Sequence, residues 1–81
     1  MITWDETKRR SNLAKHGLDF AYLDYEFFAT ALVAPSRDRC LIAIGEFRGE
    51  LIVAVVFQPL GSQALSIISM RPASRKERRL L

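Results

Sequence analysis

The sequence contains few of the residues that build disulfide-linked or metal-bound proteins. Its 81 residues include one cysteine, Cys40, and one histidine, His16, which excludes an internal disulfide and leaves too few ligands for a structural zinc ion. The longest apolar runs, such as residues 51–57, are far shorter than the roughly 20 residues that span a bilayer. The N-terminus lacks the basic and apolar regions of a secretion signal. We therefore expect a soluble, cytoplasmic protein that uses no metal or cofactor and binds no membrane.

The chain is long enough for one small domain and no more. Residues 1–81 form a single domain in this interpretation, and a domain of this size buries about 60–65% of its unfolded surface. We therefore expect its stability to depend partly on a partner. Hydrophobic residues make up 49% and charged residues 26% of the chain, which is typical of a globular protein and argues against disorder.

The positive charge is concentrated at the C-terminal end. The net charge is +3, but residues 21–70 carry more acidic than basic side chains, and the last eleven residues hold five basic side chains against Glu77. Such a cluster needs a counter-charge, and phosphate is the commonest one. The distribution favours a nucleic-acid partner. The alternative is a frayed basic tail that only aids solubility.

Capping residues predict two helices in the N-terminal part. Asp5 is a good N-cap for a helix over Glu6–His16, and Gly17 can adopt the left-handed conformation that ends it. Asp19 can cap a second helix over about residues 20–28, whose apolar side chains follow the spacing of one helix face.

Three segments rich in Ile and Val predict strands. They are residues 40–47, 51–58 and 64–71. Arg48-Gly49 predicts a tight hairpin between the first two, and residues 59–63 predict a longer turn before the third, so an antiparallel meander is expected. Residues 2–4 are a candidate short first strand, and residues 31–34 are a weaker extended segment.

The remaining elements complete an α+β fold. Ser74 and Glu77 have capping-box spacing for a short C-terminal helix after Pro72. The predicted architecture is two N-terminal helices, a meander sheet of three to four strands and this last helix. The middle strand is apolar on both sides, and two short helices can cover only one face of the sheet. The other face is either covered by a partner chain or closed by strong sheet curvature.

One face of the first helix carries polar side chains that suit a nucleic acid. These are Lys8, Asn12, Lys15 and His16, at positions i, i+4, i+7 and i+8. Amines, an amide and an imidazole together can contact phosphates and bases, and the alternative is an ordinary solvated helix face. Imidazole transfers protons in both directions near neutrality, so His16 is a candidate acid or base for RNA cleavage by the 2′-hydroxyl, which requires no metal. Its alternative role is a helix C-cap.

A second group of candidates lies at the end of the last predicted strand. Arg71 can present its planar fork to a phosphate, and Ser69 points the same way. Alternatively, Arg71 forms a surface ion pair with an acid such as Asp24 or Glu26. Glu77 can act as a general base, and the capping box is the structural explanation for the same residue.

Three further side chains can contact RNA. Arg75 and Arg78 can reach phosphates from the C-terminal helix or remain solvated. Trp4 can stack on a base, or it closes the core against the sheet. No Gly-rich phosphate loop, paired-carboxylate signature, Cys–His dyad or metal motif accompanies them. The residues by themselves therefore indicate a small basic α+β domain that binds nucleic acid.

The order of these pieces resembles BrnT-type toxins over nearly the whole chain. Residues 4–8 (WDETK) and 12–20 (NLAKHGLDF) look like the W-D-x-x-K and N-x-x-K-H-G opening of that family. Residues 67–78 (IISMRPASRKER) resemble its I-I-S-A-R-x-A-T-x-x-E-R ending, and residues 42–45 with the hairpin that follows also fit. Two separate motifs in the same order make the resemblance specific.

The resemblance implies a ribonuclease toxin of a type II toxin–antitoxin pair, with a fold related to the RelE group. Its partner would be a BrnA-like antitoxin, a ribbon-helix-helix protein that neutralises the toxin, represses the shared operon and supplies any contact with operator DNA. The antitoxin would cover the spare apolar surface, and a homodimer and a heterotetramer both stay open as assemblies. The positions carried over as active-site or RNA-contact residues are Lys8, Lys15, His16, Arg71, Glu77 and Arg78.

The resemblance implies an active enzyme, and one alternative function stays open. In the active enzyme His16 acts as acid or base, the lysines and Arg71 hold the phosphate, and the C-terminal helix assists through Glu77 and Arg78. The alternative is a catalytically inactive partner that binds the antitoxin and co-represses the operon. It rests on two departures from the family pattern, namely Pro72 at a position that is often basic and a chain that stops at Leu81 without the usual aromatic-containing helix.

Overall fold

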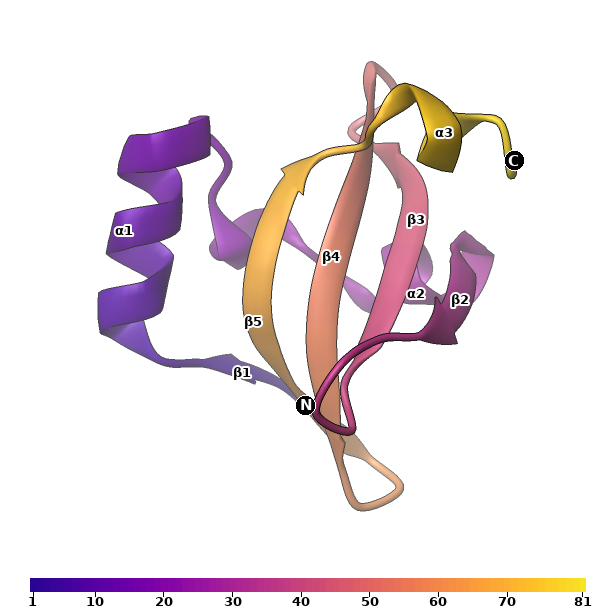
Figure 1. Cartoon of the computed structure of the whole chain (residues 1–81). Coiled ribbons are helices and arrows are strands. Elements are labelled where there is room, and N and C mark those ends of the chain that lie inside the picture. Colours follow the sequence, from indigo (N-terminus) through magenta and orange to yellow (C-terminus); the bar gives the residue numbers. More distant parts are fainter.

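A five-stranded sheet organises the chain (Figure 1). The computed structural model describes residues 1–81. In chain order, its elements are β1 (Ile2–Trp4), α1 (Glu6–His16), the 3₁₀ helix η1 (Phe20–Tyr22), α2 (Tyr25–Thr30), β2 (Leu32–Pro35), β3 (Leu41–Phe47), β4 (Leu51–Leu60), β5 (Ala64–Pro72) and α3 (Arg75–Arg78). The strands lie in the order β1-β5-β4-β3-β2. The predicted α+β class is confirmed.

The central strands form the meander that the sequence predicts. β3 pairs with β4, and β4 pairs with β5, both antiparallel. Arg48 and Gly49 make the tight turn between the first two, with φ of 56° and 73°. These left-handed conformations match the twist of a short hairpin, and the predicted hairpin is confirmed.

The outer strands make the sheet larger and mixed. β2 pairs with β3 antiparallel, whereas β1 pairs with β5 parallel, from Ile2 opposite Leu65 to Trp4 opposite Ile67. The expected antiparallel sheet of three to four strands is therefore corrected to a mixed sheet of five. The parallel pair joins segments from opposite ends of the chain, a register that local sequence patterns do not encode.

The second predicted helix is interrupted. Asp19 caps only the single turn of η1, and the chain is extended again at Leu23, with φ −76° and ψ 139°. Asp24 is a competing N-cap whose carboxylate accepts the Phe27 N–H at 2.9 Å, so a new helix, α2, begins after it. The prediction of one helix over residues 20–28 is wrong, although its apolar side chains still pack in the core.

The turn after β4 is shorter than predicted. β4 continues through Pro59, and only residues 61–63 form the turn. The β3–β4 pairing ends where Leu41 faces Phe57, so Pro59 has no β3 partner and its missing N–H interrupts no ladder there. The predicted loop over residues 59–63 is corrected accordingly.

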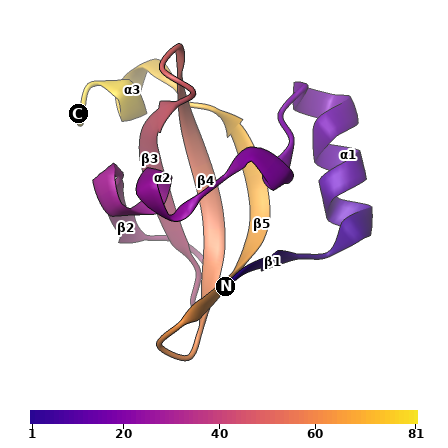
Figure 2. The ribbon, with the colours of Figure 1, turned by 180° about the vertical axis from the view of Figure 1, so that it is seen from behind.

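The helices cover one face of the sheet. η1 and α2 lie behind the central strands in Figure 1 and in front of them in Figure 2. The core fills the space between these helices and the sheet. Its largest fully buried side chains are Phe20, Val53, Val55, Ile67 and Met70.

The opposite face, which we call the open face, has no helix packed over its centre (Figure 1). Its apolar floor consists of Ile42, Ile44, Ile52, Ala54 and Val56. Ser69 and Arg71 of β5 point the same way, because they pair with Val56 and Ala54. The two central residues of the floor are buried and the others are half-buried. The helices thus leave one apolar face available, as predicted.

A β-bulge sets the side-chain directions in β5. Between the pairs Val56–Ser69 and Phe57–Ile67, one residue of β5, Ile68, has no partner. The extra residue shifts the alternation, so that Ile67 and the residue three positions later both lie in the core. The bulge therefore directs the polar side chains at the end of β5 to the open face.

Candidate functional site

α1 and β5 line a shallow depression at one side of the sheet, which we call the α1–β5 groove. Its volume is about 390 Å³. The lining residues are Thr7, Lys8, Ser11, Asn12, Lys15, His16, Ile68 and Ser69. The structure thus brings together the four polar residues predicted to share one helix face, and it places the predicted Ser69 of β5 beside them.

Caps at both ends fix α1 where the sequence predicts it. The Asp5 carboxylate accepts the Thr7 N–H at 2.8 Å, and Gly17, with φ 70°, donates its N–H to the Leu13 carbonyl at 2.8 Å. Lys15 and His16 therefore occupy the last turn, where the helix dipole favours cations. The Gly17 backbone caps this end, so the half-buried His16 imidazole is not needed as a C-cap.

Ion pairs divide the basic side chains of α1 into two sets. Arg9 binds Glu6 at 2.7 Å and Asp19 at 3.0 Å, and Arg10 also contacts Glu6, at 3.3 Å. None of these residues lines the groove. The groove side instead carries the two lysines of α1, which take no part in these ion pairs. Its uncompensated positive charge suits a phosphate.

Asn12 fastens α1 to the sheet. Its amide nitrogen donates to the Leu18 carbonyl at 3.1 Å, and its amide oxygen accepts the Met70 N–H at 3.0 Å. The residue is 8% exposed. Since both ends of the amide already bond inside the protein, the geometry supports a structural task for Asn12 in place of the RNA contact expected from its spacing.

At the end of β5, Glu77 holds Arg71. The guanidinium Nη1 and Nη2 donate to the two carboxylate oxygens at 2.6 and 2.9 Å. The same carboxylate accepts the Ser74 N–H at 2.8 Å, and the Ser74 hydroxyl accepts the Glu77 N–H at 3.1 Å. The predicted capping box is confirmed. We call this arrangement the Arg71–Glu77 clasp, and it anchors α3 to the end of β5.

The clasp determines the protonation of Glu77. Hydrogen bonds from the Arg71 guanidinium and the Ser74 N–H, together with the positive charge of Arg71, outweigh partial burial and lower the pKa of Glu77 to about 2. Near neutral pH the Glu77 carboxylate is therefore ionised, and both of its oxygens accept hydrogen bonds from Arg71. A group in this state is poorly suited to take a proton from a substrate.

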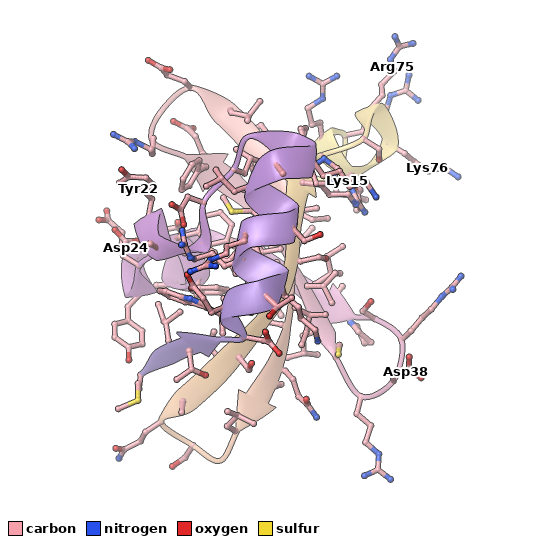
Figure 3. All side chains as sticks on the ribbon, turned by 90° about the vertical axis from the view of Figure 1, so that its left-hand side faces the viewer. Lys15, Tyr22, Asp24, Asp38, Arg75 and Lys76 are labelled. Carbon is pink, nitrogen blue, oxygen red and sulfur yellow. The ribbon has the colours of Figure 1, made fainter.

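Asp24, one of the acids predicted as a partner of Arg71, lies on the other side of the sheet from Lys15 (Figure 3). In Figure 3, Lys15 and Arg75 lie toward one side of the sheet and Asp24 lies toward the other. Arg71 does form an ion pair, as the alternative predicted, but its partner is Glu77 on α3 and not Asp24 or Glu26, which belong to the α2 region on the covered face.

The other residues predicted to contact RNA differ in burial and in their contacts within the protein. Trp4 is half-buried, its indole N–H donates to Glu6 at 3.2 Å, and its ring packs edge-on against Phe20 with centroids 6.5 Å apart. This geometry matches the alternative in which Trp4 closes the core. Arg75 and Arg78 are exposed on α3.

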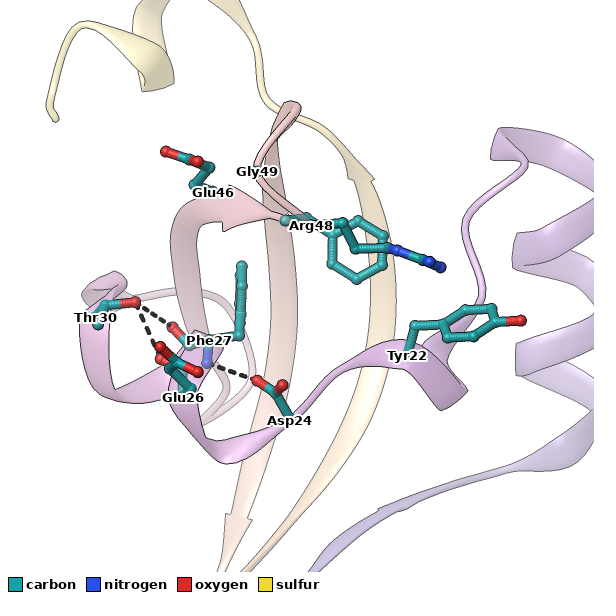
Figure 4. Close-up of a pocket in the computed structure, with 9 residues that line it drawn as sticks. Tyr22, Asp24, Glu26, Phe27, Thr30, Glu46, Arg48 and Gly49 are labelled. Carbon is teal, nitrogen blue, oxygen red and sulfur yellow. Dashed lines mark hydrogen bonds between the residues drawn. The ribbon is translucent and has the colours of Figure 1, made fainter.

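A second depression, on the covered side, has no counterpart in the sequence prediction (Figure 4). Its volume is about 410 Å³, and it is lined by Tyr22, Asp24, Glu26, Phe27, Thr30, Glu46, Phe47, Arg48 and Gly49. The Arg48 guanidinium lies 4.7 Å above the centre of the Tyr22 ring. Three carboxylates against one cation make this depression unsuited to phosphate.

Two further properties of the structure concern metals and membranes. No three side chains of His, Cys, Asp or Glu come together as a candidate metal site. None of the helices has the length and apolar character required to cross a membrane.

Replacing Asn12 tests its structural task. Asn12→Ala leaves the Met70 N–H and the Leu18 carbonyl without their partners, so we expect the free energy of unfolding to fall by about 2–4 kcal/mol. Ser11→Ala, at the neighbouring position of the groove, is the control and should change it by less than about 0.5 kcal/mol. Urea unfolding followed by tryptophan fluorescence measures both. Equal stability of the two variants would contradict the structural task.

The clasp predicts an acid-sensitive contribution to stability. The pKa of Glu77 is lowered from 4.5 to about 2, so its stabilisation is complete above the unfolded-state value and is lost as the pH falls toward 2. Because Arg71 is 39% exposed, solvent screening limits the effect to roughly 1–2 kcal/mol. Glu77→Gln should therefore destabilise the protein at about pH 7 and much less at about pH 3 in urea unfolding. Glu26→Gln is the control. If Glu77→Gln lowers the free energy of unfolding by the same amount at both pH values, the stabilisation by the clasp is not electrostatic.

Comparisons with known proteins identify the family. A family model described as the ribonuclease toxin BrnT of type II toxin–antitoxin systems matches residues 4–77. Among solved structures, the 1.1 Å crystal structure of the Brucella abortus ribonuclease toxin BrnT is 61% identical in sequence, with a TM-score of 0.86 and a match that covers 91% of this chain and 96% of that one. A search of curated proteins gave no match. The predicted resemblance is confirmed, and the chain belongs to the BrnT family, the ribonuclease toxins of type II toxin–antitoxin systems.

Proposed function

We propose that this ribonuclease toxin cleaves RNA at the α1–β5 groove and the adjoining end of β5, with protein side chains and without a metal ion. The observation that carries the proposal is the convergence of a histidine, two lysines and a fixed arginine. Lys8, Lys15 and His16 line the groove with Ser69. Arg71 follows Ser69 two positions later, on the same face of β5.

Each of these groups has a task in cleavage by the neighbouring 2′-hydroxyl of RNA. The 2′-oxygen loses its proton and bonds to phosphorus, the P–O5′ bond breaks, and the leaving 5′-oxygen gains a proton. The products are a 2′,3′-cyclic phosphate and a free 5′-hydroxyl. His16 makes one of the two proton transfers. The lysines and Arg71 stabilise the added negative charge on the phosphorus oxygens.

Glu77 serves this site by holding Arg71. Its carboxylate binds Nη1 and Nη2 of the guanidinium, and Nη1 also donates to the Pro72 carbonyl at 3.4 Å. The Nε–H and the second N–H of Nη2 remain free for a phosphate. An arginine that is fixed before the substrate arrives loses less side-chain entropy on binding than a mobile one. This role replaces the general-base role considered for Glu77.

The remaining candidates act around this centre. Arg75 and Arg78 bind the flanking phosphates from α3, and the Ser69 hydroxyl offers a hydrogen bond in the groove. Trp4 and Asn12 support the site from the core, since their polar atoms are bonded within the fold.

The partner that we infer is a BrnA-type, ribbon-helix-helix antitoxin that neutralises this chain and represses the shared operon. Contact with operator DNA comes from the antitoxin, and the assembly is a homodimer or a heterotetramer. Membership of a toxin family from type II systems supports a protein antitoxin. A cytoplasmic location and a fold relation to the RelE group belong to the same inference.

Cleavage by purified variants tests the site. The parent should cut a fluorescent single-stranded RNA in excess EDTA and leave 2′,3′-cyclic phosphate ends. His16→Ala and Arg71→Lys should lower kcat/KM by about 100-fold or more, because the first removes a proton-transfer group and the second removes the planar fork. Arg48→Gln, on the covered side, is the matched control and should cut like the parent.

Three outcomes would contradict the proposal. Abolition of parent activity by EDTA, with recovery on adding a divalent ion, would remove the metal-independent mechanism. Unchanged cleavage by both site variants would show that the site lies elsewhere. Failure of the folded parent to cut any RNA, with tight binding to an antitoxin, would favour the inactive-partner alternative.

A further inference from the structure

The loop between β2 and β3, residues 36–40, carries two arginines outside the site described above. Arg37 and Arg39 are both exposed. Neither takes part in an ion pair or a side-chain hydrogen bond, whereas Arg9, Arg10 and Arg71 are all paired with carboxylates. These two loop arginines therefore present unneutralised positive charge to the surroundings.

The loop lies on the same side of the sheet as the proposed site. It passes in front of the lower ends of the central strands in Figure 1. In the perpendicular view of Figure 3, Asp38 at its tip lies toward the same side as Arg75 and Lys76, and Tyr22 and Asp24 lie toward the other. The open face is thus flanked by α1 and α3 near one end and by this loop near the other.

The backbone holds the loop in a defined shape. The Ser36 N–H donates to the Cys40 carbonyl at 2.9 Å, and the Cys40 N–H donates to the Arg37 carbonyl at 2.9 Å. Asp38 and Arg39 both adopt left-handed conformations, with φ of 54° and 65°, which is uncommon for residues other than glycine. The arginines therefore extend from a closed hairpin turn and not from a free segment.

The distance between the two basic ends fits several nucleotides. Arg71 faces Ala54 on β4, and Leu41, where β3 begins after the loop, faces Phe57 on the same strand. Three residues along a strand and two inter-strand spacings separate Arg71 from Leu41, which corresponds to roughly 14 Å between their Cα atoms. The surface between them is the apolar floor of the open face, whose outer residues remain partly accessible.

We propose that the two arginines of this loop form a second phosphate-binding element, so that the substrate is a single RNA strand lying across the open face from the site to the loop. This rests on the proposed function. Phosphates are bound at the two basic ends, and unpaired bases lie on the apolar floor between them. A duplex keeps its base faces stacked inside, so only an unpaired strand can use this floor.

Binding of a non-cleavable strand tests the loop separately from catalysis. The probe is a fully 2′-O-methylated RNA of about 12 nucleotides, whose affinity is measured at several salt concentrations. Each phosphate contact of a single strand contributes about 0.7 to the slope of log K against log salt. Arg37→Gln and Arg39→Gln should each lower that slope by about 0.7 relative to the parent. Arg48→Gln makes the same charge change on the covered side and should leave the slope unchanged.

Cleavage of substrates of different length supplies the second readout. Each loop variant should raise KM severalfold for an RNA of about 12 nucleotides while kcat stays constant. Neither should affect a dinucleotide, because its single phosphate is the one cleaved at the site and none is left for the loop. This pattern separates a distal contact from a general loss of fold or charge, which would affect both lengths.

The outcomes distinguish this inference from the function on which it rests. If the parent cleaves RNA but the loop variants match Arg48→Gln in salt slope and KM, the loop inference is overturned and the proposed function stands. If the loop variants cleave normally but escape neutralisation by the antitoxin, the loop is a protein contact and the inference is also overturned. If the parent neither binds nor cleaves RNA, the proposed function itself fails.

Discussion

The position of the candidate site depends on which group accepts the backbone N–H at the edge of β5, past the point where its pairing with β1 ends. The short strand β1 pairs with β5 only as far as Ile67. Farther along, the Met70 N–H has no neighbouring strand on that side, and the Asn12 side chain accepts it. One amide thereby continues the edge of the sheet from a helix. Because Asn12 is on α1, this hydrogen bond sets the helix beside the end of β5, and the groove between them is the result.

The same arrangement determines which charges are available to a substrate. On α1, the arginines are bound to Glu6 and Asp19, and the lysines facing β5 remain unpaired. At the end of β5, Arg71 is paired, but its bidentate partner fixes its direction. The bulge at Ile68 places Ser69 and Arg71 on the open face. A small domain without a metal-ligand cluster thus gathers both positive charge and a proton-transfer group at one location.

Local chemistry made much of this fold predictable. Asp5, Gly17 and the Ser74–Glu77 capping box each act within a few residues, and their predicted roles are confirmed. The same rules predict one helix after Asp19, which is wrong because Asp24 is a second cap five residues later. Competition between two adequate caps depends on tertiary packing, which the local pattern does not contain.

The features missed from the sequence depend on long-range contacts. The parallel pairing of β1, the bulge in β5 and the hydrogen bond from Met70 to Asn12 all join distant parts of the chain. Helical spacing correctly put Asn12 on a face with Lys8 and Lys15, but spacing alone does not show that this face turns into the protein at Asn12. Glu77 has two roles, of which the local pattern shows one. The spacing from Ser74 predicts the capping box, but it does not show that the same carboxylate also binds Arg71.

The central claim is that RNA binds where α1 meets the end of β5. The most direct test is an NMR titration of the isotope-labelled parent with a 2′-O-methylated RNA strand that it cannot cleave. The account predicts that the largest shift changes occur in the His16 ring, the Ser69 amide and the side-chain N–H signals of Arg71. Shift changes concentrated instead on Tyr22, Asp24 and Arg48, with His16 and Ser69 unaffected, would contradict it.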